Sequence, residues 1–119
     1  MNNFLLTVMT FPNFKNKHLA EALFHPSDFV NYKKWKKTDF PSKYLIMYSP
    51  RPYNYLLRKY KGKFKKIELD RHMTIIKIGD VGLIRIRGIG APHSATVIEE
   101  LIALGGKQFI NIGTAGGLQ

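Results

Sequence analysis

Cysteine is absent from this chain of 119 residues, which excludes disulfide bonds and thiol chemistry and agrees with a cytoplasmic location. Long apolar runs are missing too. The run at residues 4–9 is too short to cross a bilayer and lacks the basic start and small-residue cleavage site of a signal peptide. The histidines show no metal-site spacing. We therefore expect a cytoplasmic protein with no membrane partner, metal or cofactor.

Acidic residues are scarce, since 8 Asp and Glu stand against 19 Lys and Arg and give a formal net charge of +11. Residues 33–66 hold twelve of the cations and a single acid, Asp39. Aromatic residues lie within or beside this block: Tyr32, Trp35, Tyr44, Tyr48, Tyr53, Tyr55 and Tyr60. Such a block could bind nucleic acid through phosphate contacts and base stacking. A solvated face that attracts anionic substrates is the better interpretation, because the lysines form no recognisable groove-reading motif.

Length and composition favour one small folded domain, because fifteen aromatic residues and plentiful Ile and Leu can form a modest core. Specific motifs are confined to the later part of the chain. We therefore divide it into an N-terminal helical or irregular segment, residues 1–43, and an α/β domain, residues 44–119.

Hydrophobic patterning predicts the elements of the first half. Residues 18–24 are a short helix candidate, and a second short helix is expected from Ser27 or Asp28 to about residue 35. The apolar run at 43–48 lies between prolines, as expected for a strand buried on both faces of a parallel sheet. Residues 53–60 would form the helix that follows.

The residue pattern of the second half of the chain predicts a hairpin, a helix and a strand. Residues 71–78 and 81–87 flank Gly79-Asp80, a plausible tight connection. A helix is expected over 92–104 and a strand over 108–112. The expected apolar stripe of that helix is Ala95, Ile98, Leu101 and Ile102. Strands that alternate with helices indicate an α/β fold.

Two glycine-rich turns are the most informative feature. The first is Gly88-Ile89-Gly90-Ala91-Pro92-His93-Ser94, before a helix with Glu99-Glu100-Leu101. The second is Gly113-Thr114-Ala115-Gly116-Gly117, directly after a strand. Glycines permit close backbone approach, and a loop after a strand can direct free N–H groups at an anion. The first turn is no dinucleotide fingerprint, because His93 occupies the place of its third glycine.

This order and spacing resemble the nucleoside phosphorylase family, most closely its uridine phosphorylase-like branch. The strong part of the resemblance covers residues 88–118, and a weaker match extends back to Tyr44. It implies the N-terminal half of a phosphorylase-like mixed sheet flanked by helices. It also implies phosphorolysis of the N-glycosidic bond of a nucleoside, in a homo-oligomer that binds nucleoside and phosphate, with phosphate as co-substrate. The resemblance does not identify the base.

The resemblance also implies roles for particular residues. Gly113 and Thr114 would bind phosphate, together with Arg71, which matches an arginine lent across a subunit interface. Arg51 is a further candidate for phosphate binding, as a substitute at a position that differs from the family pattern. A guanidinium suits this role because it grips two phosphate oxygens and stays charged. The nucleoside would be bound by His25, Thr114, Ala115 and Gly116.

Two positions differ from the phosphorylase pattern. Asn111 stands where phosphorylases usually have an arginine, and Ser49-Pro50-Arg51-Pro52 replaces a glycine-containing phosphate loop. Loss of an arginine removes a bidentate contact worth about 1.5–3 kcal/mol. Nucleosidases of the same superfamily carry Asn at this point and use water as the nucleophile, so hydrolysis stays open as an alternative.

Family members continue for about as long again after the Gly-Thr turn. That later part supplies the acid that protonates the leaving base and the Glu that holds the ribose. We therefore expect residues 1–119 by themselves to contain no catalytic residue and to be inactive. Two further possibilities stay open, namely a catalytically silent truncated oligomer and a basic nucleic-acid-binding module.

Overall fold

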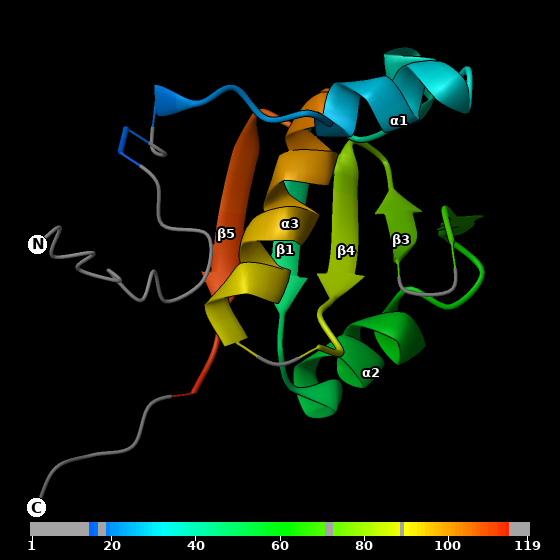
Figure 1. Ribbon diagram of the computed structural model, residues 1–119. Coiled ribbons are helices and arrows are strands. Elements are labelled where there is room, and N and C mark those ends of the chain that lie inside the picture. The colour runs from blue at the N-terminus through cyan, green and yellow to red at the C-terminus, as the bar shows by residue number, and fades with distance from the viewer. Residues whose placement is uncertain (1–14, 17–18, 71–72, 89, 115–119) are drawn as a thin grey trace, which may run out of the picture.

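The computed structural model describes residues 15–16, 19–70, 73–88 and 90–114, which form a five-stranded mixed sheet between helices (Figure 1). The strand order is β2-β3-β4-β1-β5. Strand β1 pairs in parallel with β4 and β5, whereas β3 is antiparallel to β2 and β4. The expected α/β fold is thereby confirmed. The strands are β1 (Lys43–Met47), β2 (Lys65–Glu68), β3 (Thr74–Ile78), β4 (Val81–Arg85) and β5 (Gln108–Ile112).

Helices cover both faces of the sheet. The helical elements are α1 (Pro26–Tyr32), the 3-10 turn η2 (Lys37–Asp39), α2 (Pro50–Lys59) and α3 (Gly90–Ala103). One face of the sheet packs against α3 and α1 through a large cluster that includes Tyr44, Ile46 and Leu101. The other face packs against α2 through Met47, Tyr53 and Leu83. The predicted strand at 43–48 is therefore confirmed over 43–47 and is covered on both faces, whereas Tyr48 lies beyond it and is exposed.

Helix α3 turns to the core a side that only partly matches the expected stripe. Its buried residues are Val97 and Leu101, and Leu104 follows them into the same cluster. Of the predicted stripe, Leu101 is confirmed as buried and Ile98 packs against the core, whereas Ala95 and Ile102 were wrong because they are exposed. The apolar pattern of an isolated helix does not decide which of its sides is buried. Contact with the sheet and with α1 decides it for α3.

The hairpin at Gly79-Asp80 is confirmed, with antiparallel pairing of β3 and β4 and a positive φ of 57° at Gly79. Strand β2 was not predicted, because its sequence Lys-Lys-Ile-Glu has one apolar residue. The helix expected over 18–24 was wrong, since no helix is found over 19–24 within the described part of the chain. No helix among the described residues is long and apolar enough to span a membrane.

Candidate functional site

The carboxyl ends of the three parallel strands lie at the same edge of the sheet. Met47 of β1 is in register with Arg85 of β4 on one side and with Ile112 of β5 on the other. The Ile86 N–H continues this pairing by donating to the Met47 carbonyl at 2.9 Å. The segments after β1, β4 and β5 therefore leave the sheet side by side, at the lower edge in Figure 1. Ligands of open α/β sheets commonly bind at this edge.

Gly113 and Thr114, predicted to bind phosphate, follow β5 at this edge and are both exposed. A Cβ atom built on Gly113 would lie 3.7 Å from Cδ2 of Tyr48, an ordinary van der Waals contact, so the backbone there is open. A glycine backbone beside a threonine hydroxyl can donate to an anion from this position. The predicted nucleoside residues Ala115 and Gly116 lie outside the described residues.

Tyr48 lies against this loop and contacts Asn111. Its hydroxyl donates a hydrogen bond to Asn111 Oδ1 at 3.1 Å. Nearer the start of each strand, Tyr44 and Phe109 stack with ring centroids 5.7 Å apart and an interplanar angle of 9°. Because side chains an even number of residues apart on a strand share a face, Asn111 lies on the same face as Phe109, which α3 covers, and the hydrogen bond brings the Tyr48 hydroxyl to it. Tyr48 was not predicted as a site residue, since a tyrosine after an apolar run carries no specific signal.

Arg51 is exposed in the first turn of α2, which begins directly after β1 at the same edge. Arg71 lies outside the described residues. Other cations lie near Tyr53 of α2. The charges of Arg87, Lys66 and Arg85 act to lower the pKa of Tyr53, although burial raises it overall. A cavity of about 560 Å³ lies beside them and is lined by Lys66, Glu68, Leu69, Asp70, Thr74 and Arg87.

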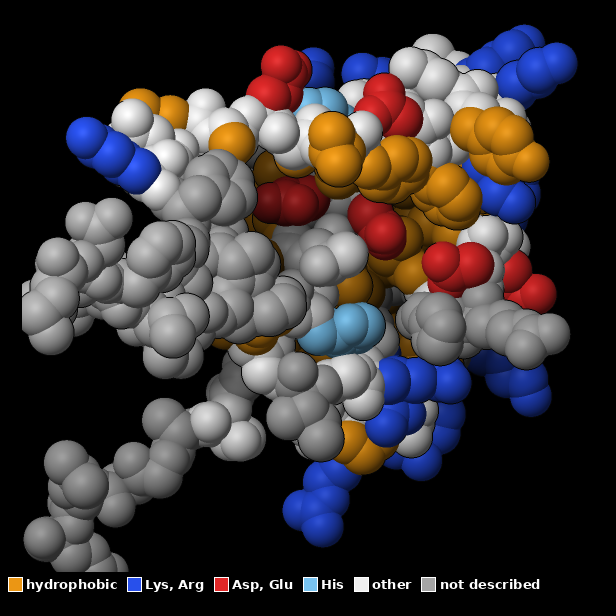
Figure 2. All heavy atoms as spheres, in the orientation of Figure 1, with side chains coloured by type: hydrophobic (Ala, Val, Ile, Leu, Met, Phe, Trp, Pro, Cys, Tyr) orange, Lys and Arg blue, Asp and Glu red, His pale blue; other side chains and the backbone are white. Residues whose placement is uncertain are grey.

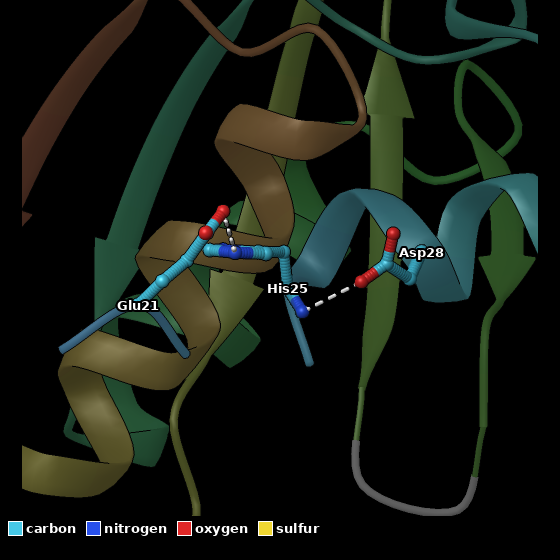
Figure 3. A network of polar contacts seen from close by, with 3 residues as sticks. All are labelled: Glu21, His25 and Asp28. Atoms are coloured by element: carbon cyan, nitrogen blue, oxygen red, sulfur yellow. Dashed lines mark hydrogen bonds and ion pairs between the residues drawn. The ribbon is translucent and has the colours of Figure 1, made fainter. Parts of the chain in front are cut away.

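His25 stands at the start of α1, at the end of the sheet opposite to Gly113 and Thr114 of the same chain (Figure 1). Its backbone N–H donates to Asp28 Oδ2 at 2.8 Å, and its Nε2 lies 3.8 Å from Glu21 Oε1 (Figure 3). These contacts support the first turn of α1. The structure therefore does not bring His25 together with Thr114 within one chain.

His93 is another residue whose surroundings the sequence did not indicate. A Cβ atom on Gly88 would lie 2.2 Å from Cδ2 of His93, so this ring packs directly over the Gly88 backbone. A cavity of about 320 Å³ beside it is lined by Asp70, Met73, His93, Thr96, Val97 and Glu100. Figure 2 shows recessed acidic side chains and a histidine on this face. Burial, with Asp70 nearby, raises the pKa of Glu100, and His93 opposes the rise.

The basic block does not form a continuous stacking surface. Tyr44 and Tyr53 are buried, and Trp35 makes edge contacts with Phe29 and Phe40. Tyr32 and Tyr55 are exposed. Most lysines of the block are exposed, which agrees with a solvated charged face.

Within the described part of the chain, no group of three or more His, Cys, Asp or Glu side chains is placed to hold a metal ion. Comparisons with protein-family models, with curated proteins and with solved structures found no match to this chain. Functional interpretation therefore depends on the residues themselves and on their arrangement at the sheet edge.

Proposed function

We propose that this chain carries the phosphate site and part of the ribose site of a nucleoside phosphorylase-like protein. In the reaction, a phosphate oxygen attacks the anomeric carbon of the ribose, the N-glycosidic bond breaks, and the base leaves with the bonding electron pair. Sites would be shared in a homo-oligomer, with Arg71 and His25 reaching a neighbouring chain's ligand.

One observation carries the proposal, namely the common register of Met47, Arg85 and Ile112. It brings the glycine-containing segment after β5 beside the segments that begin α2 and α3. The Gly113 N–H and the Thr114 hydroxyl are exposed donors for phosphate oxygens, and Arg51 supplies a charge at the same edge. Backbone N–H donors have no side-chain rotamers to order on binding, in contrast to the long side chains of exposed lysines.

Phosphate binding to the 119-residue chain tests this proposal. Titration with inorganic phosphate, followed by amide resonances, should perturb Gly113 and Thr114 first. Thr114→Val removes the hydroxyl at similar volume and should weaken binding by roughly three- to tenfold. Thr38→Val is the matched control, because Thr38 is an exposed threonine in η2. Perturbation confined to Lys33, Lys34, Lys36 and Lys37 would instead favour a nucleic-acid-binding module.

Hydrolysis is the second candidate, and Asn111 is the observation that favours it. The Asn111 side chain is neutral and engaged by Tyr48, so it offers phosphate less attraction than a guanidinium would. If water is the nucleophile, a nucleoside should bind equally well with and without phosphate. Phosphate alone should then leave the Gly113 resonance unchanged.

A further inference from the structure

The hydrogen bond between Tyr48 and Asn111 goes with one of the two orientations of the Asn111 amide. An asparagine amide carries an acceptor oxygen and a donor NH2 group of nearly equal size, and a flip about its last torsion exchanges them. Tyr48 Oη donates to Asn111 Oδ1 at 3.1 Å. The oxygen is thereby turned toward Tyr48, and the NH2 group is turned away from it.

The free donors lie where a ligand can reach them. Asn111 is exposed, and Tyr48 retains 42% of its accessible surface. Among the residues that the structure describes, none accepts a hydrogen bond from Asn111 Nδ2. Asn111 is two residues before Gly113, and the Tyr48 ring would touch a Cβ atom placed on Gly113. The pair therefore adjoins the loop that would bind phosphate.

A purely structural role explains this pair poorly. Hydrogen bonds between exposed side chains contribute little to stability, because water replaces either partner at small cost. The three strands are already held in register by backbone pairing and by the buried residues Ile46 and Met47. The feature that depends on the Tyr48 hydroxyl is the orientation of the Asn111 amide.

We propose that Tyr48 is a positioning residue that holds the Asn111 amide with its NH2 group available to an oxyanion at the Gly113-Thr114 loop. This inference rests on the proposed function. Asn111 then supplies neutral donors where an arginine would supply charge. In this orientation the Tyr48 hydroxyl donates to the amide oxygen, which leaves both N–H groups of the NH2 for the oxyanion. After a flip, one of them would donate to Tyr48 Oη instead.

The test is a double-mutant cycle on phosphate affinity in the 119-residue chain. Tyr48→Phe should weaken phosphate binding by roughly three- to tenfold while leaving the melting temperature nearly unchanged. Asn111→Ala should weaken binding at least as much. If Tyr48 acts through Asn111, adding Tyr48→Phe to Asn111→Ala should change the affinity no further. Tyr55→Phe is the matched control, because Tyr55 is exposed on α2 and 56% accessible.

A spectroscopic measurement and a second variant complete the test. The side-chain NH2 resonances of Asn111 should shift in Tyr48→Phe without ligand and stay unchanged in Tyr55→Phe. Asn111→Asp can still accept from Tyr48 but has no donors at neutral pH, so it should abolish phosphate binding in a folded chain.

Three results would overturn the inference in distinguishable ways. Wild-type affinity in Tyr48→Phe would remove the positioning role and leave the phosphate site intact. Additive effects of Tyr48→Phe and Asn111→Ala would mean that Tyr48 contacts phosphate directly. A wild-type chain that binds no phosphate at millimolar concentration would overturn the proposed function and this inference together.

Discussion

Asp80 accepts two hydrogen bonds from Ser42, one from the backbone N–H at 2.8 Å and one from the hydroxyl at 2.6 Å. Lys43 adds a bond from its own N–H to the Asp80 carbonyl at 3.3 Å. Together these contacts connect the turn before β4 to the start of β1 across 38 residues of chain. The Ser42 hydroxyl, followed by its N–H, lowers the pKa of Asp80.

This pKa shift predicts a loss of stability in acid. The folded chain holds the Asp80 proton less tightly than the unfolded chain does, so the stabilisation is present above the unfolded pKa of about 4 and declines as pH falls through the folded pKa. Asp80→Asn should lower the melting temperature at neutral pH and flatten its fall in acid. Asp39→Asn, on an exposed residue, is the control. Equal acid dependence in wild type and Asp80→Asn would contradict the prediction.

Leu101 and Ile102 are neighbours on α3 with opposite environments, since Leu101 is fully buried and Ile102 is 52% exposed. Leu101→Ala should lower the free energy of unfolding by about 2–5 kcal/mol, because it leaves a cavity in the core. Ile102→Ala should change it by about 0.5 kcal/mol or less. Urea unfolding of the two variants measures the difference. A larger loss for Ile102→Ala than for Leu101→Ala would contradict the burial of Leu101 in the core.

Gly88 leaves no room for a side chain beneath the His93 ring. Gly88→Ala should cost about 1–3 kcal/mol of unfolding free energy, because the new methyl group collides with the imidazole. His93→Ala in the same chain should restore much of that loss, as expected for two residues in contact. Gly113→Ala is the control, since its methyl group would meet only an ordinary contact at 3.7 Å. Additive losses in the double variant would argue against the collision.

The outer edge of β5 predicts self-association. Strand β5 lies at the edge of the sheet, carries no charged residue, and exposes Ile110 at 64% and Ile112 at 42%. The opposite edge strand, β2, instead carries exposed lysines, which discourage edge pairing. We expect an oligomer by light scattering and a shift toward monomer in Ile110→Lys. Lys65→Glu on β2 should leave the assembly unchanged. A single species of 13.7 kDa at micromolar concentration for wild type would refute the expectation.

Local signals predicted the second half of the chain well. The strand at 108–112 has the bounds expected, and the hairpin at Gly79-Asp80 forms as its turn residues indicated. Helix α2 begins at Pro50, three residues before the predicted start, because proline is well tolerated in the first turn. Strand β2 was missed because it has one apolar residue. The helix at 18–24 was wrong, and its apolar residues Leu19, Leu23 and Phe24 are exposed. Half of the stripe expected on α3 was wrong as well.

The sequence by itself determined most of the strands and helices, and it placed two glycine-rich segments after predicted strands. Those features depend on residues close together in the chain, whose periodicity and turn chemistry are local. Tertiary structure decided which side of α3 is buried, and it placed His93 over Gly88. It also joined Tyr48 to Asn111, a contact across 63 residues. The Tyr48–Asn111 contact depends on the register between distant strands, which the pairing of β1 with β5 sets only when the sheet assembles.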